Sequence, residues 1–492
     1  MGSDCRRKAL ASAGLAGAFL AVSGEPVAAS NVAAGLGQER ELAVPTWLVL
    51  VTGGAAVGAS GLLAALVTDR TFVSSLHDWT KPLRSPPSAA PVGGALGVVA
   101  LLAVVIVGLE GPAMPTANLA VLLAFVGLRA VLPMVAFLVV DPWPAIDPFR
   151  TVAEGVRRVG SRIGLGGNER GTGLEDGHGV AERGVDERGI VTYPERLRSW
   201  PALAGLAVLV WLELALPVTA DPRVLALLAA GYTGYAVCGA VTFSPAVWFR
   251  RADPFTVLFR LYGAIAPIQR VGPDRRLVLV VPGSGLRRDG VTVDSSEVAI
   301  VLFLVWELTF NGFVVTPPGA ATVRSLVSAG LSPAAAYLVV LLVGYAVFAT
   351  AFHAATVLAR RTAPTYLPTA TLTRRFAPPL LAIAAGYHLA HYAAFALSLS
   401  PATASALTNP LSPPVNPTVF AIPGWIGGFE VAALLVGHLL AVWAAHAVSF
   451  DLFPGRLQAI RSQYPFIAVM IGYTALSLWL LSLPATAPPF VE

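Results

Sequence analysis

The stretch Gly386-Tyr387-His388-Leu389-Ala390-His391-Tyr392 sets two histidines three residues apart in a run without Asp, Glu, Lys or Arg from residue 376 to residue 400. Such a run is long enough to cross a lipid bilayer as one helix. At positions i and i+3, the two imidazoles project from one helix face. Ionisable side chains in hydrocarbon are costly and usually mark a functional site. The stretch therefore predicts a membrane fold with a site inside it.

The composition of the whole chain points the same way. Of its 492 residues, 55% are hydrophobic and 12% are charged, and the mean hydropathy is +0.70, whereas soluble domains carry about 25% charged residues. No basic patch is interleaved with aromatic residues, which excludes nucleic acid as a partner. Cys5 and Cys238 are too few for a disulfide framework or a cysteine-based metal site.

Ten apolar segments are long enough to span a bilayer, so we expect an all-α integral membrane protein with about ten transmembrane helices in a bundle. The segments are residues 45–67, 90–109, 118–140, 199–218, 224–243, 296–316, 333–357, 376–400, 425–448 and 464–484.

The amino end predicts a signal peptide over residues 1–29, followed by a transmembrane domain over residues 30–492. Arg6-Arg7-Lys8 precedes a short apolar run that ends in small residues. With the mature amino end outside, alternating helix directions place 26 of the 33 Lys and Arg residues inside and three outside. This asymmetry follows the positive-inside rule. It predicts a multi-pass protein of the cell membrane with both mature ends outside the cytoplasm.

Two inner loops share a motif that ends in Asp-Pro-Phe. Residues 143–149 read Trp-Pro-Ala-Ile-Asp-Pro-Phe, and Trp248 is followed by Asp253-Pro254-Phe255. In each motif Asp can cap a helix and Pro suits the first helical position. Apolar residues then recur at helical spacing with arginines between them, so we expect short interfacial helices on the cytoplasmic side.

The predicted spans contain a set of ionisable residues. At a rise of about 1.5 Å per residue, most of them fall in the middle and outer half of the bilayer, with two histidines near its inner mouth. The set comprises Arg129, Glu213, Glu307, Glu430, His353, His388, His391, His438 and His446. Each histidine alone could form a hydrogen bond between helices, and Arg129 could reach the interface or pair with a carboxylate.

Together, these residues predict two tiers. His388, His391 and His438, with Glu430, Glu307 or Glu213 and Asn311, would hold a divalent metal ion such as zinc, iron, manganese or copper in the upper tier. His446 and His353 would form a lower tier, because eight residues of helix separate His446 from His438 by about 12 Å. The lower tier would serve as a proton path, a second metal site or part of a haem site.

The sequence resembles the fenitrothion hydrolase-like membrane proteins across most of the mature chain. The shared motifs are Leu42-Ala43-Val44-Pro45-Thr46-Trp47-Leu48, Trp211-Leu212-Glu213, Phe310-Asn311-Gly312-Phe313, Ala390-His391-Tyr392, Gly437-His438, His446, Gln463-Tyr464-Pro465, Met470-Ile471-Gly472-Tyr473-Thr474 and Leu478-Trp479-Leu480. The resemblance implies hydrolysis of an organophosphate ester in or at the membrane. The family pattern has Asp where this chain has Asn311 and Ala447.

Three functions follow as alternatives. The first is a metal-dependent hydrolase with Glu307 and Glu430 as catalytic carboxylates, whose apolar substrate enters beneath the uncharged loop 401–424. The second is transport of protons or metal ions along Arg129, the carboxylates and the histidine tiers. The third is electron transfer through haem b held by histidines of the eighth and ninth helices.

Overall fold

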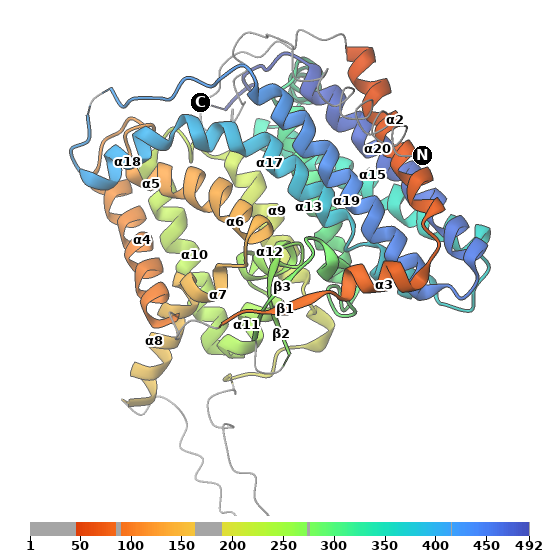
Figure 1. Cartoon of the computed structure of the whole chain (residues 1–492). Helices are drawn as coiled ribbons and strands as arrows, with labels where there is room; N and C mark the ends of the chain where they lie inside the picture. The colour runs from red at the N-terminus through yellow and green to blue at the C-terminus, as the bar shows by residue number, and fades with distance from the viewer. Residues whose placement is uncertain (1–45, 85–89, 163–188, 273–275, 415, 492) are drawn as a thin grey trace, which may run out of the picture.

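The computed structural model describes residues 46–84, 90–162, 189–272, 276–414 and 416–491 (Figure 1). The predicted signal peptide, residues 1–29, lies outside this range. Within it, eight helices are long and apolar enough to cross a membrane, which confirms a multi-pass α-helical membrane fold. These spans are α4 (Ala90–Glu110), α5–η3–α6 (Leu119–Leu122, Leu123–Val131, Leu132–Leu138), α10 (Pro222–Phe243), α13 (Ser295–Val314), α15 (Pro333–Thr362), α16–α17 (Thr369–Phe376, Leu380–Ser398), α19 (Ile426–Leu452) and α20 (Arg456–Ser482).

The other two predicted spans differ from the rest. Helix α2 (Thr46–Leu66) is followed, after a bend of 112°, by the short polar helix α3 (Arg70–Asp78). Helix α9 (Trp200–Ala215) is apolar but has only 16 residues. A helix of this length rises about 24 Å, less than the hydrocarbon thickness of about 30 Å.

The bundle has two ends, which we name by what lies there. The sheet face, at the bottom of Figure 1, carries the antiparallel sheet β1–β3–β2 (Thr80–Pro82, Arg276–Val280, Ile268–Val271). The C-terminal face, at the top of Figure 1, carries the carboxyl end of the chain together with α14 (Pro317–Ser328) and α18 (Ser400–Thr408).

Helices α17 and α19 approach each other closely at a pair of glycines. A Cβ atom built on Gly386 would lie 2.8 Å from the Cα atom of Gly437, and a Cβ on Gly437 would lie 2.9 Å from the Cα of Gly386. Only glycine therefore permits this approach. Next to this pair, α13 is buried on nearly all sides, as expected for a helix that is apolar around its whole circumference.

The third span contains a π-helical segment, η3, at Arg129. Pro133 has no N–H to donate, and the Leu132 N–H bonds to the Gly127 carbonyl five residues back. A π-helix inserts an extra residue into the turn and often occurs at functional sites. The insertion changes the direction in which Arg129 projects from the span.

Both Asp-Pro-Phe motifs cap helices at the sheet face, as predicted. Asp147 accepts from the Arg150 N–H at 3.0 Å at the start of α8 (Pro148–Arg162), and Asp253 accepts from the Thr256 N–H at 2.7 Å at the start of α12 (Pro254–Gly263). The rings of Phe149 and Phe255 stack at 5.9 Å. The two motifs therefore pack against each other, after the short helices α7 (Trp143–Ile146) and α11 (Pro245–Arg251).

Candidate functional site

The candidate site centres on a charge cluster that consists of Arg129, Glu213 and Glu307. Nη2 of Arg129 donates a hydrogen bond to Oε1 of Glu307, while its Nε lies 3.6 Å from Oε2 of Glu213. The Glu307 side chain is 4% exposed and that of Glu213 is 12% exposed. Three helical segments thus meet at one arginine: η3, α9 and α13. Of the two alternatives for Arg129, the structure shows pairing with carboxylates.

The two carboxylates are held differently. Asn311, one turn after Glu307 on α13, donates from Nδ2 to Oε1 of Glu307 at 2.7 Å, so this oxygen accepts two hydrogen bonds. The guanidinium carbon of Arg129 lies 5.3 Å from the centre of the Tyr392 ring, at cation–π distance. The contact of Glu213 is longer than a hydrogen bond, and the buried Nε of Arg129 has no hydrogen-bond acceptor within the described residues. Glu307 is therefore fixed and Glu213 is loosely held.

The charges of the cluster do not balance. One guanidinium faces two carboxylates, so the cluster carries a net charge of −1 when both glutamates are ionised. Placing an uncompensated charge in a low-dielectric interior costs several kcal/mol. The cluster is electrically neutral only with one further positive charge.

His388 lies beside this cluster. Its Nε2 is 3.1 Å from the carbonyl oxygen of Ala130, the residue after Arg129. Its ring packs edge-on against Phe137 and lies 4.5 Å from the ring of Tyr392. His388 thus links α17 to the π-helical segment, and this contact is the helix-to-helix hydrogen bond that sequence reasoning left open.

Within the described residues, no contact with the charge cluster is recorded for His438, His446 or His353. His438 is fully buried; its Nδ1 is 2.9 Å from the Leu434 carbonyl, and its Nε2 has no hydrogen-bond partner among the residues described. His446 has its Nδ1 3.1 Å from Oε1 of Gln463 and its Nε2 2.8 Å from the Val67 carbonyl. His353 is exposed on α15.

These positions do not assemble the predicted metal site. Within the described chain, no group of three or more His, Cys, Asp or Glu side chains is arranged to hold a metal ion. A metal at His446 would have to displace a carbonyl oxygen from one ring nitrogen. The contact between Gly386 and Gly437 leaves no room for a porphyrin between α17 and α19 at that level. The residues therefore fit neither group, and we derive no chemical step through a metal or haem.

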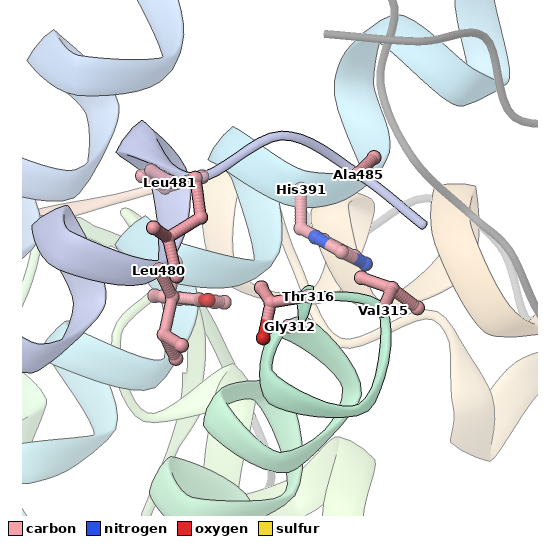
Figure 2. A pocket seen from close by; sticks show the side chains of 9 residues that line it. Gly312, Val315, Thr316, His391, Leu480, Leu481 and Ala485 are labelled. Carbon is pink, nitrogen blue, oxygen red and sulfur yellow. The ribbon is translucent and has the colours of Figure 1, made fainter. Parts of the chain in front are cut away.

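Two pockets open near the C-terminal face. The first has a volume of about 20 Å³, room for about one water molecule, and His391, Tyr387, Gly312 and Thr316 are among its lining residues (Figure 2). His391 is therefore the one predicted ligand that lines a described pocket. Glu430, also from the predicted upper tier, is fully buried on α19.

The second pocket is larger, about 390 Å³, and we call it the α9 pocket. It is lined by Leu214, Ala215, Leu216 and Pro217 at the end of α9, and by Phe490 and Val491. The C-terminal segment 483–491 contributes residues to both pockets, and none of the described residues of the predicted lid, 401–424, lines either one.

Sequence reasoning placed Arg129 near the bilayer midplane but did not make it the centre of the site. A lone arginine in an apolar span was the available signal, because such a residue needs a partner in hydrocarbon. The role of segment 483–491 had no comparable signal, since none of its residues is charged.

Comparisons with known proteins add no relative. No protein-family model matches the chain, and no match was found among proteins of curated function or among solved structures. The resemblance to the fenitrothion hydrolase-like membrane proteins therefore stays a prediction, and function has to be argued from the geometry of the site.

Proposed function

We propose that the protein is a proton-coupled transporter, and that the charge cluster is its proton-binding site. The observation that carries the proposal is the sharing of one buried arginine between two carboxylates. A proton on one carboxylate makes the cluster neutral and removes the cost of a buried net charge. Glu213 is the residue that carries this proton, because Glu307 is already committed to Arg129 and Asn311.

The proposal includes a topology. Helices α2 and α9 join the eight other spans to give ten. The sheet face lies on the cytoplasmic side of the cell membrane, and the C-terminal face lies on the outer side. The distribution of Lys and Arg along the chain supports this orientation. A span as short as α9 is accommodated by local thinning of the bilayer.

Proton binding is coupled to helix position through Arg129. While Glu213 is protonated, Glu307 alone neutralises the guanidinium of Arg129. When the proton leaves Glu213, both carboxylates attract this guanidinium. A shift of Arg129 toward Glu213 moves η3, and the hydrogen bond between His388 and the Ala130 carbonyl oxygen transmits that movement to α17. Transport needs such a link between the proton site and a helix that lines a pocket.

A flux assay tests the proposal. Purified protein is reconstituted into liposomes that contain a pH-sensitive dye, and the external pH is stepped with organic and inorganic monovalent cations on both sides, because a coupled transporter moves protons only when its second substrate is present. We expect internal pH to change faster than in protein-free liposomes, and Glu213→Gln to abolish the difference, because glutamine cannot exchange a proton. Asp78→Asn, which removes an exposed carboxylate at the sheet face, is the matched control and should retain the flux. Equal rates for wild type and Glu213→Gln would refute the proposal.

A second candidate is the hydrolysis of an apolar phosphoester, with Glu307 and Glu430 as catalytic carboxylates. It is favoured by the position of His391 in a pocket. That pocket must widen to admit a substrate, because it holds about one water molecule. Product release from a chromogenic phosphotriester by purified protein, lost in His391→Ala, would support this candidate over transport.

A further inference from the structure

We infer that the α9 pocket binds a small organic monocation, which exchanges one for one with the proton of the charge cluster. The inference rests on the proposed proton-binding role of the cluster and adds the class of the transported substrate. Three features carry it: the shape and lining of the pocket, the electrostatics of the end of α9, and the charge of the cluster.

The pocket suits an organic group. Its volume of about 390 Å³ lies in the range of small-molecule sites, about 300–1,000 Å³. The side chains that line it are aliphatic apart from Phe490, and an aromatic ring can face a cation. The alkyl groups of an ammonium ion gain contacts with these apolar side chains, which an inorganic ion does not.

The pocket also lies at the negative end of a helix. Residues 214–217 form the carboxyl end of α9, where the helix dipole attracts positive charge. Pro217 has no N–H to offer to the carbonyl of Glu213, and the N–H of Val218 bonds to Leu216 rather than to Leu214. No backbone donor in the described chain takes the carbonyls of residues 213 and 214. Their partial charges add to the carboxylate of Glu213, directly before the lining residues.

The charge of the cluster sets the stoichiometry. Glu213 does not line the pocket but directly precedes the lining residues 214–217. One additional positive charge makes the cluster neutral, so a proton on Glu213 and a monocation in the adjacent pocket each offset the same negative charge and exclude one another. A divalent cation would leave an excess charge of +1. Entry of one monocation therefore releases one proton, and no net charge crosses the membrane.

The C-terminal segment forms one wall of the pocket. The Thr486 N–H donates to the carbonyl of Val315, and the hydroxyl of Tyr337 donates to the carbonyl of Pro489, each at 2.7 Å. Phe490 then adopts a φ of 63°, which is strained for a residue with a side chain. The two hydrogen bonds thus hold the Phe490 ring at the pocket, and loss of this ring should weaken binding of the cation.

Tetraethylammonium tests the inference in proteoliposomes that show the pH-driven flux described above. The liposomes are loaded at acidic pH, and tetraethylammonium chloride is added outside. We expect internal pH to rise by one proton per cation taken up, at a rate that is unchanged when a potassium gradient with valinomycin sets the membrane potential. Lowering the external pH by one unit should raise the half-saturating cation concentration about tenfold, because the two ions compete.

Two variants test whether tetraethylammonium binds in the α9 pocket. Phe490→Ala should raise the half-saturating concentration at least threefold, whereas Phe420→Ala, which removes another exposed aromatic ring outside the α9 pocket, should leave it unchanged. Proton flux without any response to tetraethylammonium would overturn the inference and leave the proposed function standing. Absence of proton flux under all conditions would overturn both. Exchange that follows the membrane potential would overturn the one-for-one stoichiometry.

Discussion

The charge cluster and the sheet face both contain an arginine shared by two carboxylates, but their surroundings differ. At the sheet face, Arg287 binds Asp451 through two hydrogen bonds of 2.6 and 2.9 Å and Asp78 through one of 2.9 Å. The side chain of Asp78 is 68% exposed, and a second arginine, Arg375, lies 3.6 Å from Asp451. In the charge cluster, the carboxylates are 12% and 4% exposed and no second arginine or lysine is recorded against them among the described residues.

The difference shows how the environment decides the role of the same set of groups. At the sheet face, Arg375 also pairs with Asp289, and water screens the exposed carboxylates of Asp78 and Asp289, so that network can stay ionised and act as a brace for the end of α19. The carboxylates of the charge cluster are far less exposed, so we expect that cluster to take up a proton or another cation. Asp451, in the last turn of α19, belongs to this brace.

Substitution of the central arginine should give the largest difference in stability between the charge cluster and the sheet face. Arg129→Ala leaves two buried carboxylates without a cation, and we expect a loss of about 3–5 kcal/mol in the free energy of unfolding. Arg287→Ala should cost about 1 kcal/mol, because solvent screens its exposed partner. Thermal unfolding of both variants in the same detergent measures the difference. Equal losses would show that burial does not distinguish the regions.

Removal of one carboxylate should have a smaller effect and should depend on pH. Glutamine at position 213 resembles the protonated carboxyl, so Glu213→Gln should be at least as stable as wild type at neutral pH. At alkaline pH, where wild type loses the proton, the variant should gain a relative advantage, because it never carries the excess charge. Asp78→Asn should shift stability by a similar small amount at both values. Melting temperatures of wild type and both variants at neutral and alkaline pH test this prediction. If the melting temperature of Glu213→Gln relative to wild type fell at alkaline pH, the account would be contradicted.

A third carboxylate tests the same physics outside the spans. Burial, and then the charge of Asp253, raise the pKa of Asp147 to about 7. A carboxyl pKa that is higher in the folded than in the unfolded protein lowers stability as pH rises from about 4 to about 7. Asp147→Asn keeps a helix-capping side chain and removes this charge, so its melting temperature should fall less than that of wild type over this window. Parallel curves would indicate that Asp147 does not titrate there.

Sequence reasoning predicted the parts of the structure that local patterns govern. The apolar runs predicted the eight spans that the structure confirms, and the Asp-Pro-Phe motifs predicted two helix caps. Glu213 and Glu307 were both predicted in the upper tier, and the structure brings them to the same arginine.

Depth alone does not say which way a side chain points, and the predicted metal tier depended on that direction. His388 and His438 were expected at similar levels, yet His388 bonds to the Ala130 carbonyl on η3 and His438 to the Leu434 carbonyl of its own helix. The π-helical turn at Arg129 depends on the Gly127–Leu132 bond beside Pro133. Neither feature follows from spacing in the sequence, because both depend on which helices become neighbours.

The protonation state of the charge cluster is the most direct test of the account. Infrared difference spectroscopy of purified protein, recorded between neutral and alkaline pH, detects the C=O stretch of a protonated carboxyl and its shift in D₂O. The account predicts such a band at neutral pH in wild type, its loss in Glu213→Gln and its persistence in Asp78→Asn. A spectrum in which Glu213→Gln and wild type carry the same carboxyl bands would show that the cluster holds no proton on Glu213, and would contradict the central claim.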